Sequence, residues 1–267
     1  MEAVAGHVAA RVPRAWEAIG AIARNTFREA VRDRVLYLLL GFAFVLIVGT
    51  PAVALLTVGS EEKIVKDLGL SALSIFGLLT SVFVGVSLVF KEIDKRTVLT
   101  LLATPVRRWQ FVAGKFAGLA LVLGLNAAVM SLVLAGTVLL RGGSPAELLP
   151  AILLIYVELC LVAAFAILFS SYTNPMLASL GTAAVYVVGH LSFSFDLLKN
   201  RMGGSAPLCD VLHAILPNLD RLDVKAQVVH GAPLPAGYVA AGVAYGALYT
   251  LAVLLLACVV FERRDFK

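Results

Sequence analysis

Long apolar runs alternate with short polar segments along this chain, and their length is the main guide to the fold. A helix needs about 20 apolar residues to cross a bilayer, so we predict an all-α polytopic membrane protein with six transmembrane helices. Gly49 and Pro51 are expected to kink or end the first helix, and His190 and Asp196 lie near the end of the fifth. The approximate ranges are 35–58, 70–90, 116–140, 148–169, 176–195 and 238–261.

A different pattern precedes the first long run. From Pro13 to Arg34, apolar residues recur at steps of three and four, and polar residues occupy the other side. Such a helix lies in the membrane interface, with its arginines near anionic lipid heads; the alternative is a helix that packs on the protein itself. We expect residues 1–34 to form this unit and residues 35–267 the transmembrane domain. The predicted interfacial residues are Trp16, Arg24, Phe27, Arg28 and Arg32.

A second amphipathic segment, residues 91–115, separates the second and third apolar runs. Its charges hold it in water at a membrane face, while Val98, Leu101 and Leu102 have the spacing of a helix with one apolar side. Pro105 ends that helix at or before Thr104. Exposed apolar residues of this kind need a partner surface, so the segment is a candidate site for docking of a soluble protein. The alternative is a helix that lies on lipid.

Composition and charge placement support a membrane protein and suggest its orientation. The chain is 60% hydrophobic and 15% charged, with a mean hydropathy of +0.94, and a soluble domain could not bury that much apolar side chain. The net charge of +5 reflects Lys and Arg gathered in the N-terminal segment, in residues 91–115 and in the C-terminal tail. Lys and Arg mark cytoplasmic segments, so both termini are expected in the cytoplasm and residues 197–237 outside. The positions therefore indicate membrane orientation and not nucleic-acid binding.

Catalytic motifs are missing from the sequence. It contains no Gly-x-x-x-x-Gly-Lys-Ser/Thr phosphate-binding loop, no Gly-x-Ser-x-Gly and no His-Glu-x-x-His. Any ATP hydrolysis must come from another chain. The His and Asp residues of 197–237 match no known metal-site spacing, so no metal site is predicted.

Glu158 is the one strong charge near the middle of a predicted span. A carboxylate there is costly and by default a functional hypothesis, so Glu158, Asn126 and His190 are candidates for a substrate pathway. The alternative is a structural role, in which Glu158 hydrogen-bonds to Asn126 or to a Ser or Thr of a neighbouring helix. Two Gly-x-x-x-Gly pairs, Gly114 with Gly118 and Gly242 with Gly246, permit close contact between helices.

The order of motifs along nearly the whole chain resembles the ABC type-2 transporter permease family, the membrane subunits of ATP-binding-cassette exporters. The motifs are Arg28-Glu-Ala-Val-Arg-Asp-Arg34, then Glu92, Arg96-Thr97, Leu101-Leu102, Pro105, Arg108 and Gly114-Lys115, then Phe169-Ser-Ser-Tyr-Thr-Asn-Pro175, Leu216-Pro-Asn-Leu-Asp220 and Phe261-Glu-Arg-Arg-Asp-Phe266. The resemblance does not identify the substrate.

The resemblance implies a coupling helix around Lys95–Thr104 that docks on an ATPase. The docking residues would be Glu92, Lys95, Arg96, Thr97, Leu101, Leu102 and Arg108. It also implies a second permease copy or a related permease, and two cytoplasmic ATP-binding subunits that hold ATP and Mg. This chain would bind no cofactor and would not be an enzyme. Its expected location is the inner membrane of a prokaryote, with export as the direction of transport.

Two other classes of protein are alternatives to the permease. One is a secondary transporter driven by an ion gradient, with Glu158 as the proton carrier; the lack of an internal repeat disfavours it. The other is an intramembrane enzyme that uses Glu158 and His190, which the lack of a paired motif disfavours.

Overall fold

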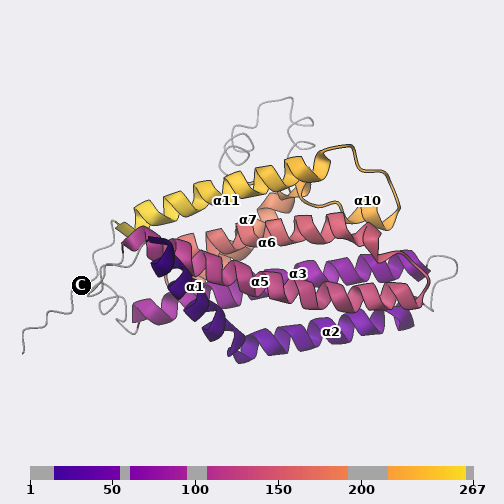
Figure 1. Ribbon diagram of the computed structural model, residues 1–267, viewed down its shortest axis with the longest axis horizontal. Helices are drawn as coiled ribbons and strands as arrows, with labels where there is room; N and C mark the ends of the chain where they lie inside the picture. Colours follow the sequence, from indigo (N-terminus) through magenta and orange to yellow (C-terminus); the bar gives the residue numbers. More distant parts are fainter. Residues whose placement is uncertain (1–14, 55–60, 95–106, 192–215, 263–267) are drawn as a thin grey trace, which may run out of the picture.

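The computed structural model describes residues 15–54, 61–94, 107–191 and 216–262, and every regular element in these ranges is a helix (Figure 1). The elements are α1 Ala15–Val31, α2 Arg34–Ala54, α3 Glu61–Asp94, α5 Arg108–Leu140, η1 Pro145–Leu148, α6 Leu149–Ser170, α7 Pro175–His190, η2 Leu219–Arg221, α10 Lys225–Val229 and α11 Tyr238–Glu262.

Five of these helices, α2, α3, α5, α11 and α6 with η1, are long and apolar enough to cross a membrane. They run along the long axis of the molecule, and α1 crosses one end of the bundle (Figure 1). We call this end, which holds Arg108 and Glu262, the α1 end, and the end that holds Glu61 and Arg141 the far end. The predicted class, an all-helical multi-pass membrane protein, is confirmed.

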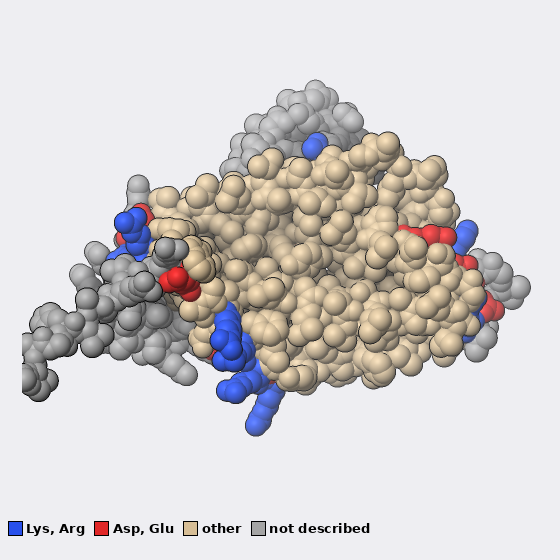
Figure 2. All heavy atoms as spheres, viewed as in Figure 1, with Lys and Arg blue, Asp and Glu red and all other residues tan. Residues whose placement is uncertain are grey.

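The surface of the bundle is that of a protein surrounded by lipid. On the face shown in Figure 2, most of the described charges gather at the two ends, with uncharged surface between them. Large apolar side chains of the long helices are exposed, among them Leu132 of α5 at 75% and Leu248 of α11 at 69%. A protein surrounded by water would rarely expose so much apolar surface.

Two helices begin earlier than the sequence predicted. α3 begins at Glu61 and not near residue 70, because the charges of its first turns have partners at the far end. Lys66 is buried and its Nζ lies 2.7 Å from both Glu62 Oε1 and Glu147 Oε2, and Glu61 pairs with Arg141. α5 begins at Arg108 and not near residue 116, so residues 108–115 of the predicted polar segment are helical.

The first long helix also differs from its prediction. α2 continues through Pro51 to Ala54, so neither Gly49 nor Pro51 ends it. Arg141 Nη2 donates a hydrogen bond of 3.2 Å to the Pro51 carbonyl, which joins α2 to the start of the α5–α6 connection. Residues 55–58, the end of the predicted span, lie outside the described residues.

The fifth predicted span is short in the structure. α7 has 16 residues, or about 24 Å of helix, against a hydrocarbon core of about 30 Å. Asn174 caps its start by accepting a hydrogen bond of 2.9 Å from the Leu177 N–H, and Pro175 is its first residue. The remainder of the predicted span, residues 192–195, lies outside the described residues.

The chain is described again from Leu216, and residues Leu216–Val229, which we call the return segment, pack on the bundle. Within this segment η2 contacts α7, and α10 contacts α3 and α6. Five of its apolar side chains are buried, so this part of the predicted outer loop is built into the core. They are Leu219, Leu222, Val224, Val228 and Val229.

Both Gly-x-x-x-Gly pairs lie at close helix contacts, as predicted. A Cβ on Gly118 of α5 would lie 2.5 Å from Thr26 Cβ and 2.7 Å from the Ala23 carbonyl oxygen, both on α1. Gly242 and Gly246 of α11 face Leu154 and Val157 of α6 in the same way. Helix α1 therefore packs on the protein itself, which was the alternative in the sequence analysis. Its expected place in the membrane interface remains a prediction.

Candidate functional site

The predicted docking residues lie mostly beyond the described part of the chain. Lys95, Arg96, Thr97, Leu101 and Leu102 lie outside the described residues, and only the backbone of Glu92 is described, in the last turns of α3. Their docking role therefore remains a prediction.

Arg108, the last of the predicted docking residues, makes a defined contact at the first position of α5. Its Nη1 donates hydrogen bonds of 3.0 Å to the Phe261 carbonyl and 2.8 Å to the Glu262 carbonyl. The last carbonyls of a helix have no partner within the helix and carry partial negative charge, so a guanidinium stabilises them well. Arg108 thereby fastens the start of α5 to the end of α11.

The second contact at the α1 end involves Lys115, which is only 2% exposed. Lys115 was expected among the solvated charges of residues 91–115; this was wrong, because α1 packs over it. Lys115 Nζ lies 3.9 Å from Glu29 Oε2 of α1 and 5.8 Å from the centre of the Phe111 ring. Phe111 in turn stacks on Phe261 of α11, with 5.6 Å between ring centres. Helices α1, α5 and α11 are thus joined in one unit at this end.

The predicted interfacial residues of α1 divide between two faces. Phe27 is partly buried and packs against the core, while Trp16 is 66% exposed. Arg24, Arg28 and Arg32 follow one another at four-residue steps and are all exposed, so they form one basic row on the helix.

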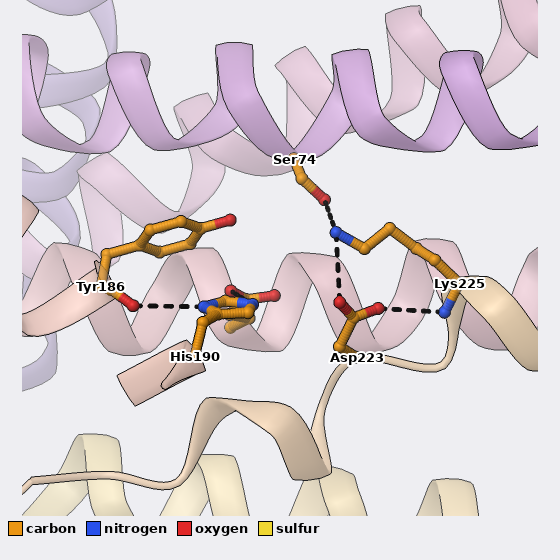
Figure 3. Close-up of polar contacts among 6 residues, drawn as sticks. Ser74, Tyr186, His190, Asp223 and Lys225 are labelled. Carbon is orange, nitrogen blue, oxygen red and sulfur yellow. Dashed lines mark hydrogen bonds and ion pairs between the residues drawn. The ribbon is translucent and has the colours of Figure 1, made fainter. Parts of the chain in front are cut away.

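A group of polar side chains lies deeper in the bundle, where α7 ends (Figure 3). Glu158 of α6 is 1% exposed, and its Oε1 lies 3.3 Å from His190 Nε2 of α7. The contact lacks the geometry of a hydrogen bond, and neither oxygen of Glu158 has a hydrogen-bond partner among the described residues. The other ring nitrogen of His190 lies 3.2 Å from the Tyr186 carbonyl, and the two rings are 4.5 Å apart.

The return segment adds charged groups to this place. Lys225 Nζ lies 3.4 Å from Asp223 Oδ2 and 3.3 Å from Ser74 Oγ of α3 (Figure 3). We call Ser74, Glu158, Tyr186, His190, Asp223 and Lys225 the junction cluster, because they lie where the end of α7, the return segment, α3 and α6 meet. Ser74, Asp223 and Lys225 were not predicted as site residues, since no periodicity in the sequence places Lys225 beside Ser74 of α3.

Asn126 does not belong to this cluster. Its Nδ2 donates a hydrogen bond of 2.8 Å to Thr80 Oγ1 and so joins α5 to α3. A hydrogen bond between Glu158 and Asn126, one form of the structural alternative for Glu158, is not formed in the structure, and Asn126 is engaged with Thr80 instead. Of the three candidate pathway residues, the structure brings Glu158 and His190 together and leaves Asn126 apart.

The described bundle contains an apolar pocket large enough for a small ligand. This pocket, of about 350 Å³, lies between α5, α6 and α11, with Tyr156, Cys160 and Thr250 as its polar lining residues. Among the described residues, no group of three or more His, Cys, Asp or Glu side chains is arranged to hold a metal ion.

Comparison with known proteins agrees with this arrangement. A search of curated proteins finds no match. A family model described as "ABC-2 family transporter protein" matches residues 20–266, from α1 to the C-terminal tail, and the chain therefore belongs to the ABC-2 transporter family.

Proposed function

We propose that this chain, the permease-type membrane component of an ABC transporter by its family, is half of an exporter in the inner membrane of a prokaryote. It pairs with a second copy or a related permease, and two ATP-binding subunits bind at the α1 end, which faces the cytoplasm. ATP and Mg are held by those subunits, and this chain supplies the substrate pathway and the surface on which they act.

The observation that supports this proposal most directly is that α1, α5 and α11 are joined to one another at the α1 end. The predicted docking segment lies between the end of α3 at Asp94 and the start of α5 at Arg108, so a push on it reaches both helices directly. Arg108 transmits that movement to the end of α11 through its two hydrogen bonds. The contacts of Gly114 and Gly118 with α1 are so close that α1 must move together with α5. A docked ATPase could therefore move three helices from one short segment.

Charge supports the cytoplasmic orientation of the α1 end. Its described charges are mostly basic, with Arg24, Arg28, Arg32, Arg107 and Arg108 on α1 and at the start of α5. At the far end, the charges of the first α3 turns are mixed and largely paired with one another and with Arg141. Excess Lys and Arg at one end is typical of the cytoplasmic side.

Docking is tested by the substitution Leu101→Asp. Truncating or charging an apolar anchor costs a few kcal/mol in a well-packed interface, whereas an exposed charge pair contributes about 1 kcal/mol or less. We expect Leu101→Asp to leave the permease inserted and paired but to abolish copurification of the ATP-binding subunit and transport-coupled hydrolysis. Arg96→Ala, the matched control, should have a milder effect that depends on salt. Wild-type copurification and hydrolysis with Leu101→Asp would refute docking at this segment.

A further inference from the structure

The apolar pocket between α5, α6 and α11 has the size of a small-molecule site. Phe116 and Ala120 of α5 line one side of it, and Ala247 and Leu251 of α11 line another. Two of these four residues are alanines, whose side chains leave a volume of about 350 Å³ between the helices. Ligand pockets in proteins are typically about 300–1,000 Å³, so this one is large enough to hold a molecule.

The position of the pocket gives it access to the bilayer. Its lining residues Leu254 and Ala247 lie eight and fifteen residues before Glu262, the last residue of α11. At about 1.5 Å per residue these positions are about 12 and 22 Å from that end of the helix, which is within the depth of the hydrocarbon core. Ala247 is exposed and Leu251 is 54% exposed, so the rim of the pocket lies on the outer surface of the bundle. None of the described lining residues is charged, which favours an uncharged ligand.

One hydroxyl of the pocket has a hydrogen bond to offer. Thr250 is only 7% exposed, and its Oγ1 has no hydrogen-bond partner among the described residues. Other hydroxyls in the bundle donate to a backbone carbonyl, as Thr182 does to Ala178 at 2.7 Å and as Tyr156, also in the pocket, does to Ala120 at 3.2 Å. A buried hydroxyl without a partner is costly, and a threonine in a helix has two accessible rotamers through which it can turn toward a ligand. An acceptor atom that enters the pocket therefore gains a hydrogen bond from Thr250.

We propose that this pocket binds an uncharged, largely apolar molecule with one hydrogen-bond acceptor, such as a carbonyl oxygen, to which Thr250 donates. The molecule enters sideways from the bilayer, past Ala247 and Leu251. The apolar lining supplies most of the affinity, and the single hydroxyl selects molecules that carry an acceptor. No residue of the junction cluster lines the pocket, so this site is separate from that cluster. The inference goes beyond the proposed function, because it depends neither on ATPase docking nor on the direction of transport.

Photolabelling of the purified full chain with benzophenone tests the proposal. Benzophenone is uncharged and apolar, has a single carbonyl, and on irradiation attaches to C–H groups that it touches. We expect its incorporation to saturate with concentration in residues 116–120, 156–160 and 247–254, which contain the lining residues. Incorporation at Leu132, which is 75% exposed elsewhere on α5, should rise without saturation. Diphenylmethane has the same two rings but no carbonyl, so it should compete about three- to tenfold more weakly than benzophenone binds, the usual effect of one hydrogen bond.

Matched variants assign the binding to this pocket. Thr250→Val keeps the shape of the side chain without its hydroxyl, so benzophenone should bind about three- to tenfold more weakly while competition by diphenylmethane is unchanged. Ala247→Trp should abolish saturable labelling by filling the pocket, whereas Ala252→Trp, at an exposed position of α11 outside the pocket, should retain it. Labelling that does not saturate in the parent chain, or that persists in Ala247→Trp, overturns the proposal. Equal binding of benzophenone by Thr250→Val and the parent chain also overturns it. Photolabelling needs no ATPase, so this proposal and the docking proposal can fail separately.

Discussion

Single residues decide how closely the helices of this protein approach one another. Gly118 is the clearest case, because the atoms nearest to an added Cβ include the backbone oxygen of Ala23, which cannot rotate away. Gly136 lies on the same helix with nothing within 4 Å of an added Cβ. Replacing each of these two glycines by alanine therefore distinguishes the effect of packing from the effect of helix propensity within α5.

We expect Gly118→Ala to destabilise the protein by about 1–3 kcal/mol, the usual cost of forcing an extra group into a packed contact. Gly136→Ala should be neutral or slightly stabilising, because alanine is the better helix former in open space. Thermal unfolding in detergent measures both, and proteolysis of α1 reports whether that helix has come loose. Equal effects of the two substitutions would contradict a tight contact between α1 and α5.

At the scale of elements, the observed helix bounds agree with the predicted ranges where the length of the apolar run alone determines the helix. The ranges 148–169 and 238–261 agree with α6 and α11 to within one or two residues. The starts of α3 and α5 were missed because their charged turns are stabilised by partners far away in sequence, such as Arg141 for Glu61 and Phe261 for Arg108. Glu158 and His190 were both candidate pathway residues, but their contact could not be predicted, since it depends on where α7 ends.

The fastening of α11 by Arg108 is testable at this scale. We expect Arg108→Ala to release the last turn of α11, with a local loss of about 1–2 kcal/mol for hydrogen bonds from a charged donor. Arg107→Ala is the control, because Arg107 is exposed and its contribution to the helix start uses the backbone N–H, which donates to Gln110 Oε1. Amide hydrogen exchange at residues 258–262 measures the effect. Unchanged protection in Arg108→Ala would show that α11 ends stably without this contact.

At the scale of the whole molecule, contacts between helices show in which direction the chain runs through the bundle. Leu154 contacts Gly242 and Val157 contacts Gly246, so α6 and α11 run in the same direction, from the far end to the α1 end. The chain must therefore travel back to the far end between Ser170 and Tyr238. Among the described residues, helix α7 covers one part of that distance and the return segment another.

If the chain crosses the membrane between Ser170 and Tyr238, the position of each site in the bundle predicts the side from which it is reached. Asn25 on α1 and Glu262 at the end of α11 lie at the α1 end, and Ser144 lies in the connection between α5 and α6 at the far end; all three are exposed. In a chain without native cysteines, Asn25→Cys and Glu262→Cys should react with an impermeant maleimide from the cytoplasmic side. Ser144→Cys should react only from the other side. If Glu262→Cys and Ser144→Cys react from the same side, α7 and the return segment do not complete a crossing, and the proposed orientation fails.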